Sequence, residues 1–144
     1  MVNRRSLVVG GLALAVAPSL VGVARAQAGK PVLVFLGADG DAATKAWRSR
    51  SESAFLKSDA IKKLDYKVIM AKTGDALYKE ESWPADLRWM LAEFLTTKEG
   101  KDAFPDQPHF ILGQDKKIVL VARGNGGWSD KMQPKIAEVT GAKA

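Results

Sequence analysis

The sequence predicts an α/β domain with the element order β-α-β-α-β-β-α, in which a central mixed sheet is flanked by helices. Three observations predict this class. An unbroken apolar run at 31–36 is typical of a strand buried on both faces. An apolar stripe with helical spacing occupies 87–95. Two runs that favour strands, 109–112 and 118–122, flank a polar turn at 114–117 and indicate an antiparallel hairpin.

The first half of the chain is expected to form two strands joined by a helix. The apolar run 31–36 is the first strand, and the glycine-rich segment 37–41 is a loop. Apolar residues then recur at helical spacing among charged ones, which predicts a helix over 42–55. A short amphipathic turn at 58–64 leads to a second strand at 66–70.

The second half opens with a polar loop at 73–82 and the clearest helix signal in the chain. Trp83, Pro84 and the early acid Asp86 favour a first turn, and the helix is expected to end near Gly100. The apolar stripe of this helix consists of Leu87, Met90, Leu91, Phe94 and Leu95.

The hairpin is followed by a glycine cluster and a last helix. The glycine cluster 124–127 is expected to be a flexible turn. Ser129 or Asp130 can cap a helix that carries its apolar side chains on one side. Those side chains belong to Met132, Ile136, Ala137 and Val139.

Residues 1–26 have the pattern of a cleavable export signal. The paired Arg4 and Arg5 precede an apolar stretch at 7–23, which ends at an A-x-A site at 24–26. The segment around the arginines also resembles a twin-arginine signal, which exports folded proteins. The alternative is a permanent membrane anchor, but the stretch is shorter than the ~20 apolar residues of a spanning helix and contains proline. We therefore expect a periplasmic protein, without a stable membrane anchor, whose single domain spans 27–144.

Charge and cysteine content exclude several classes of protein. Removal of 1–26 lowers the number of Lys and Arg from 22 to 19, against 16 Asp and Glu, so the mature chain has no strong basicity and is not expected to bind nucleic acid. The chain has no cysteine. A disulfide, a thiolate nucleophile, a cysteine-ligated zinc and an iron–sulfur cluster are therefore impossible.

The predicted elements together resemble the thioredoxin-like family over residues 29–141. Segment 30–36 looks like the central strand of that family, and 37–45 falls where its active-site loop enters the first long helix. Segment 107–112 is similar to the part that carries the family's cis-proline, which would be Pro108. Segment 116–124 looks like the last strand and its glycine.

The resemblance implies a fold whose usual chemistry is missing. The two redox cysteines of the family sit at the start of the first long helix, which corresponds to 40–43 here. Neither is present, so thiol–disulfide oxidoreductase activity is excluded. The N-terminus of that helix and the segment around the proline still offer backbone groups that could hold an extended peptide.

The leading hypothesis is therefore a redox-inactive, periplasmic thioredoxin-like protein that binds a protein or peptide, as an assembly factor or chaperone for an exported enzyme. The groove would be formed by 37–45, 107–109 and 124–128. The individual candidates are Asp39, Gly40, Asp41, Ala42, Ala43, Gln107, Pro108, His109 and Trp128. The two aspartates would favour a basic partner. The alternative interpretation is that Asp41 caps the helix and Asp39 lies in a solvated turn.

Two further interpretations stay open. A small-ligand or copper carrier would use His109, the only histidine in the chain, with Met70 or Met90 as a soft metal ligand. The strand periodicity directs His109 towards the first helix. The spacing does not match a metal site, so a structural histidine is the alternative, and no cofactor is expected. Trp128 follows a glycine cluster and is either exposed for contact or part of the core. A cysteine-independent enzyme is the least supported class, because no nucleophile and base form a recognisable pair.

Overall fold

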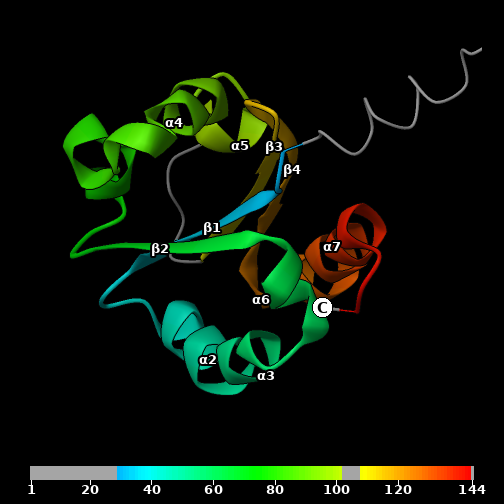
Figure 1. The fold of residues 1–144 in the computed structure, drawn as a ribbon. Helices are drawn as coiled ribbons and strands as arrows, with labels where there is room; N and C mark the ends of the chain where they lie inside the picture. Colours follow the sequence, from blue (N-terminus) through cyan, green and yellow to red (C-terminus); the bar gives the residue numbers. More distant parts are fainter. Residues whose placement is uncertain (1–28, 102–107, 144) are drawn as a thin grey trace, which may run out of the picture.

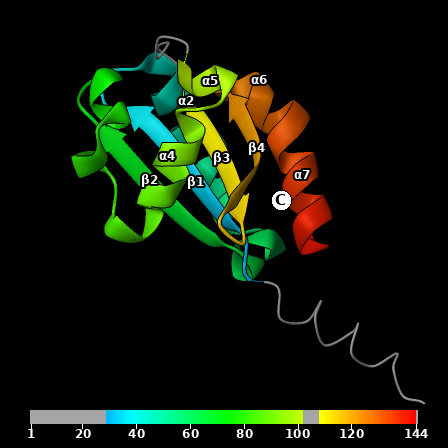
Figure 2. The ribbon, with the colours of Figure 1, turned by 90° about the horizontal axis from the view of Figure 1, so that it is seen from above.

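The computed structural model describes residues 29–101 and 108–143, so the predicted export signal and Gln107 lie outside the described residues. The described chain is a mixed α/β structure, which confirms the predicted class. Its sheet has four strands in the order β2-β1-β3-β4 (Figure 2). The described part contains no helix long and apolar enough to cross a membrane.

The apolar run at 31–36 provides most of the central strand of the sheet. β1 (Val32–Ala38) pairs in parallel with β2 (Asp65–Ala71) and antiparallel with β3 (His109–Gln114). β3 and β4 (Lys117–Arg123) form the predicted hairpin. Asp115 and Lys116 both have positive φ at its turn, as a tight two-residue hairpin connection requires.

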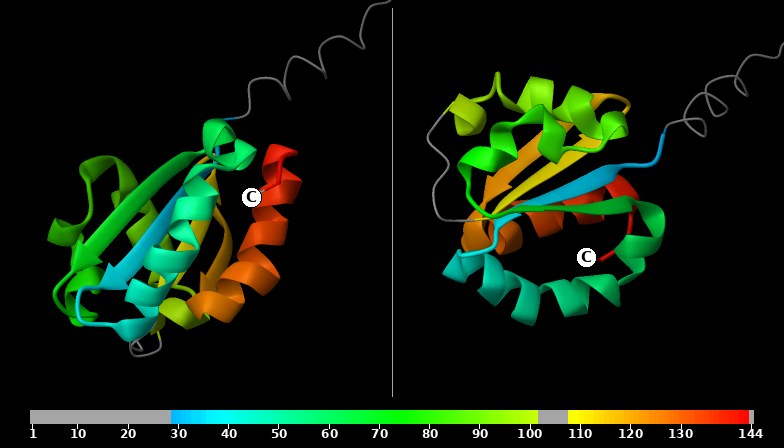
Figure 3. Two further views of the ribbon diagram at one scale, coloured as in Figure 1. Left: turned by 90° about the horizontal axis from the view of Figure 1, so that it is seen from below. Right: turned by 90° about the vertical axis from the view of Figure 1, so that its left-hand side faces the viewer.

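Helices cover both faces of the sheet (Figures 1 and 3). One face carries α2 (Ala42–Arg50), α3 (Glu52–Leu56) and α7 (Gln133–Thr140). The other carries α4 (Arg88–Phe94) and α5 (Lys98–Lys101). Side chains of β1 alternate between two apolar clusters: Leu33 and Phe35 face α2, while Val34 and Leu36 face α4. β1 is therefore buried on both faces, as expected from its continuous apolar sequence.

The helix expected to open at Trp83 and to end near Gly100 is shorter, because α4 spans only Arg88–Phe94. It is preceded by 3₁₀ turns, η2 (Asp75–Tyr78), η3 (Glu80–Ser82) and η4 (Ala85–Leu87), and the first two lie in the predicted loop. Trp83 does not open the helix, which begins at Arg88. Its indole is buried instead, and the Nε1–H donates to the Leu77 carbonyl at 2.8 Å. α4 ends where the Thr96 and Thr97 hydroxyls donate to carbonyls of its last turn.

The predicted first helix is divided at Ser51, and a partly buried polar network holds its second part. The carboxylate of Glu52, in the first turn of α3, accepts hydrogen bonds from Arg48 Nε at 3.0 Å and from the Tyr66 hydroxyl at 2.6 Å. Burial and the adjacent Glu52 raise the pKa of Tyr66 well above its usual value. The amphipathic turn at 58–64 is the 3₁₀ helix η1 (Asp59–Lys63), which leads into β2.

The glycine cluster is helical, so the prediction of a flexible turn was wrong. Its residues form α6 (Gly124–Gly127), which continues into the π-helical segment η5 (Trp128–Met132) and then α7. Neither Ser129 nor Asp130 is an N-cap, because both lie inside η5. The side chain of Trp128 holds this segment in place: its ring packs 4.9 Å from Phe110 and 5.1 Å from Trp47, centroid to centroid.

Candidate functional site

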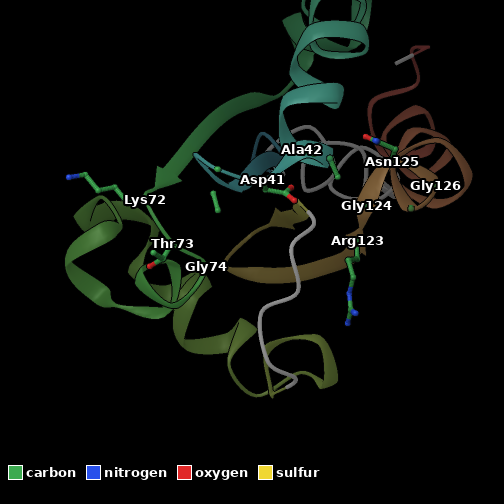
Figure 4. A pocket seen from close by; sticks show the side chains of 13 residues that line it. Asp41, Ala42, Lys72, Thr73, Gly74, Arg123, Gly124, Asn125 and Gly126 are labelled. Atoms are coloured by element: carbon green, nitrogen blue, oxygen red, sulfur yellow. The ribbon is translucent and has the colours of Figure 1, made fainter.

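A wide, open groove of about 970 Å³ lies at the end of the sheet where β1 and β2 finish (Figure 4). Three structural segments form its walls: the start of α2, the turn after β2, and α6 with the end of β4. The described residues that line it are Ala38, Gly40, Asp41, Ala42, Ala43, Lys72, Thr73, Gly74, Arg123, Gly124, Asn125, Gly126 and Gly127. Four of the predicted site residues, Gly40 to Ala43, therefore line one groove.

The first wall is ordered by Asp41, which is the N-cap of α2 as the alternative interpretation held. Its Oδ2 accepts the backbone N–H of Thr44 at 2.7 Å and the hydroxyl of Thr44 at 2.6 Å. Both residues are buried. Both donors bind the same oxygen, so Oδ2 of this carboxylate is engaged within its own helix.

Asp39 is exposed and does not line the groove, although its backbone helps to shape it. Its N–H donates to the carbonyl of Ala71 at 2.8 Å, which ties the loop after β1 to the end of β2. Gly37, at the end of β1, packs so closely against Thr44 of α2 that a Cβ added there would lie 2.6 Å from Thr44 Cγ2. The loop is therefore held by close packing and by hydrogen bonds at both ends.

The opposite wall is α6, which begins at Gly124. Its backbone φ of +72° suits glycine, and its N–H donates to the Pro108 carbonyl at 2.8 Å. Pro108 itself is buried and does not line the groove. The peptide bond between Gln107 and Pro108 involves a residue outside the described ranges, so its expected cis geometry stays a prediction.

The groove carries charges of both signs. Lys72 follows β2 and Arg123 ends β4, and in Figure 4 both side chains extend from the rim. Among the described residues, Asp41 is the only acid in the lining, and it is buried and caps α2. Of the two predicted aspartates only Asp41 is in the described lining, and the expectation that they favour a basic partner stays a prediction.

His109 lies in the core and not at the groove. Its side chain is fully buried and packs edge to face against Phe94 of α4, with ring centroids 5.9 Å apart. The expectation that it faces the first helix was wrong, because β3 alternates so that Phe110 takes that side. Met90 lies in the apolar cluster beside α4, whereas Met70 packs against the other cluster. In 29–101 and 108–143, no three His, Asp or Glu side chains are grouped as metal ligands.

Trp128 is a core residue, so the interpretation that it is exposed for contact was wrong. Its side chain is 3% exposed and packs against Trp47, Phe55 and Phe110. It acts on the groove indirectly, because it anchors the segment that follows α6.

Sequence reasoning missed Lys72, Thr73, Gly74 and Arg123. The available signal was topological: β1 and β2 are parallel, so the residues after both strands meet at one edge of the sheet. Arg123 reaches the same edge because β4, antiparallel to β3, ends beside α6.

Comparison of the chain with protein-family models, curated proteins and solved structures gave no match in any of the three.

Proposed function

We propose that this chain is an exported, cysteine-free protein with a thioredoxin-like fold that binds an extended segment of a partner protein in the groove between α2 and α6. The fold assignment is supported by the element order and by the sheet order β2-β1-β3-β4, with β1 parallel to β2 and antiparallel to β3. Export to the periplasm is supported by the pattern of residues 1–26.

The observation that carries the proposal is the open space beside two glycines, Gly40 and Gly126. A Cβ added at either would meet no atom within 4 Å, and neither has positive φ. Glycine is therefore not needed there for backbone conformation or for close packing. In α6 it even costs stability, because glycine is roughly 1 kcal/mol less favourable than alanine in a helix. Room for a ligand explains why side chains are absent at both positions.

The lining suits binding better than catalysis. The ionisable side chains among its described residues are Asp41, Lys72 and Arg123, and Asp41 is engaged by Thr44. Among the described lining residues, none is placed as a general base beside the Thr73 hydroxyl. Much of the remaining surface is backbone of glycine and alanine, which can approach another backbone closely.

Two blocking substitutions test the proposal. Gly40→Leu and Gly126→Leu place bulk in the groove from opposite walls, and at both positions the added Cβ meets no atom within 4 Å. Ala54→Leu, at an exposed position of α3 outside the lining, is the matched control. Each full-length chain would be expressed with a photo-crosslinking residue at position 125, and crosslinked proteins would be identified by mass spectrometry.

We expect a partner that is crosslinked by the parent and by Ala54→Leu, and that is lost with both glycine variants. Unchanged crosslinking with both glycine variants would place the interface elsewhere and refute the proposal. Cell fractionation tests export separately: a chain beginning at residue 27 should be found in the periplasm, and replacement of Arg4 and Arg5 by lysine should reduce its amount there.

A further inference from the structure

The outer edge of β4 has backbone groups that no described residue pairs. Gly124 N–H donates to Pro108 O, so this pair of residues is a hydrogen-bonded pair of the antiparallel ladder. Such pairs alternate along a ladder, so Ala122 also directs its N–H and C=O towards β3, whereas Val121 directs both away from the sheet. Within 29–101 and 108–143, these outward groups of Val121 have no hydrogen-bond partner.

A slot of about 300 Å³ runs along this edge. It is lined by the end of β4, by Glu99 of α5 and by Asp130 and Lys131 of η5. Arg123, Gly126 and Gly127 line both this slot and the groove, so the two spaces adjoin around α6. A segment that leaves the groove past Gly126 therefore meets the open edge of β4.

The far end of the same edge is closed. The register of the hairpin shifts at Leu112 and Gly113, and the N–H of Ile118 donates to Glu93 Oε1 at 3.1 Å. A bulge and a side-chain carboxylate are devices that prevent strand addition. The edge is thus blocked near Ile118 and left open at Val121, beside the groove.

We propose that the partner segment pairs with β4 at Val121 and adds a fifth strand to the sheet. This inference rests on the proposed function and specifies how the same ligand is held. Addition of a strand to a sheet edge gains affinity from main-chain hydrogen bonds, so the ligand is an extended peptide without proline at the residue opposite Val121. The described residues of the slot include two acids, Glu99 and Asp130, and two bases, Arg123 and Lys131, and this balance favours a segment of low net charge.

The test uses a defined probe. Random dodecapeptides displayed on phage are selected against the mature chain (27–144), and the strongest binder is synthesised for calorimetry. Val121→Pro removes the outward N–H, and proline is tolerated at such positions of edge strands. Val68→Pro is the matched control on the other edge strand, β2, where Val68 is 38% exposed and lies outside the groove.

We expect Val121→Pro to weaken peptide binding about tenfold or more, as the loss of a backbone hydrogen bond predicts, and Val68→Pro to change it less than threefold. Peptide addition should slow hydrogen exchange of the Val121 amide in the parent chain. Should Val121→Pro fail to fold, a peptide N-methylated at successive residues replaces it: one methylated position should abolish binding to the parent.

The outcomes separate the two proposals. One outcome overturns strand addition and leaves the groove function intact. In it, Gly126→Leu blocks peptide binding, but the peptide does not protect the Val121 amide, and neither Val121→Pro nor N-methylation changes the affinity. Failure of every dodecapeptide to bind overturns both. A dimer in light scattering that is lost with Val121→Pro, without any peptide binding, shows that β4 pairs with a second copy and also overturns this inference.

Discussion

Replacement of Asp41 by alanine separates a structural role of this residue from a role in binding. In the structure, Oδ2 of Asp41 accepts two hydrogen bonds from Thr44, at 2.7 Å from the backbone nitrogen and 2.6 Å from the hydroxyl. Loss of an N-cap costs about 1 kcal/mol. The Thr44 hydroxyl, with the residue only 1% exposed, would lose its acceptor, which costs roughly 1–3 kcal/mol more. We therefore expect Asp41→Ala to lower the free energy of unfolding by about 2–4 kcal/mol.

Urea unfolding followed by circular dichroism measures this change. With a slope of about 1.5–2 kcal/mol per molar urea, the midpoint should fall by about 1–2.7 M. Asp39→Ala, at an exposed position two residues earlier, should change the free energy of unfolding by no more than about 0.5 kcal/mol. Thr44→Val in the Asp41→Ala background removes the unpaired hydroxyl, and should recover about 1 kcal/mol.

An Asp41→Ala chain as stable as Asp39→Ala would refute this reasoning. It would mean that the helix start is satisfied by solvent and that the carboxylate is available for another purpose. Loss of partner crosslinking in such a stable variant would then restore the original expectation that Asp41 contacts the ligand.

Three further predictions concern the core, the partly buried network and the sheet edge. Trp128→Ala should cost about 3–5 kcal/mol in urea unfolding, because the indole is buried among three aromatic rings; a loss below 1 kcal/mol would contradict its assignment to the core. The raised pKa of Tyr66 stabilises the fold below about pH 10, where unfolded tyrosine is also protonated, and this contribution is lost as the pH rises further. The parent should therefore lose stability above pH 10 more steeply than Tyr66→Phe, in urea unfolding at successive pH values; parallel curves would contradict this. Glu93→Ala should free the N–H of Ile118 and give concentration-dependent self-association in sedimentation velocity, whereas a monomer at all concentrations would show that the bulge alone protects the edge.

The strands were predictable from the sequence because their signals are local. The run at 31–36 has no polar side chain, so it could only be buried on both faces, and it became the central strand β1. The hairpin was indicated by two strand-forming runs around a polar turn. These features depend on side chains adjacent in sequence, and neighbouring elements did not override them.

The errors arose where distant residues decide the local conformation. A four-residue segment with three glycines has weak helical preference, yet 124–127 is helical because Trp128 is fixed among Phe110, Trp47 and Phe55. Likewise, the period of two shows that His109 and Phe110 face opposite sides of the sheet, but not which helix lies on each side.

The candidate site was predictable in part for the same reason. Residues 40–43 and 124–127 follow strands in sequence, so their place at a strand end could be inferred. Lys72 and Arg123 required the strand order and the register, which a single sequence does not provide.

The state of Asp41 limits what kind of recognition this groove can use. In a helix start without a cap, the free N–H groups attract anions, and charge would dominate the choice of ligand. Here Asp41 already satisfies the N–H of Thr44 and places a carboxylate at the positive end of α2. The helix start is therefore partly neutralised from within, and the cations Lys72 and Arg123 lie at the rim. Under the proposed function, selectivity then depends mainly on shape beside Gly126 and on main-chain pairing at Val121. A proline or an N-methyl group in the ligand should therefore matter more than its charge.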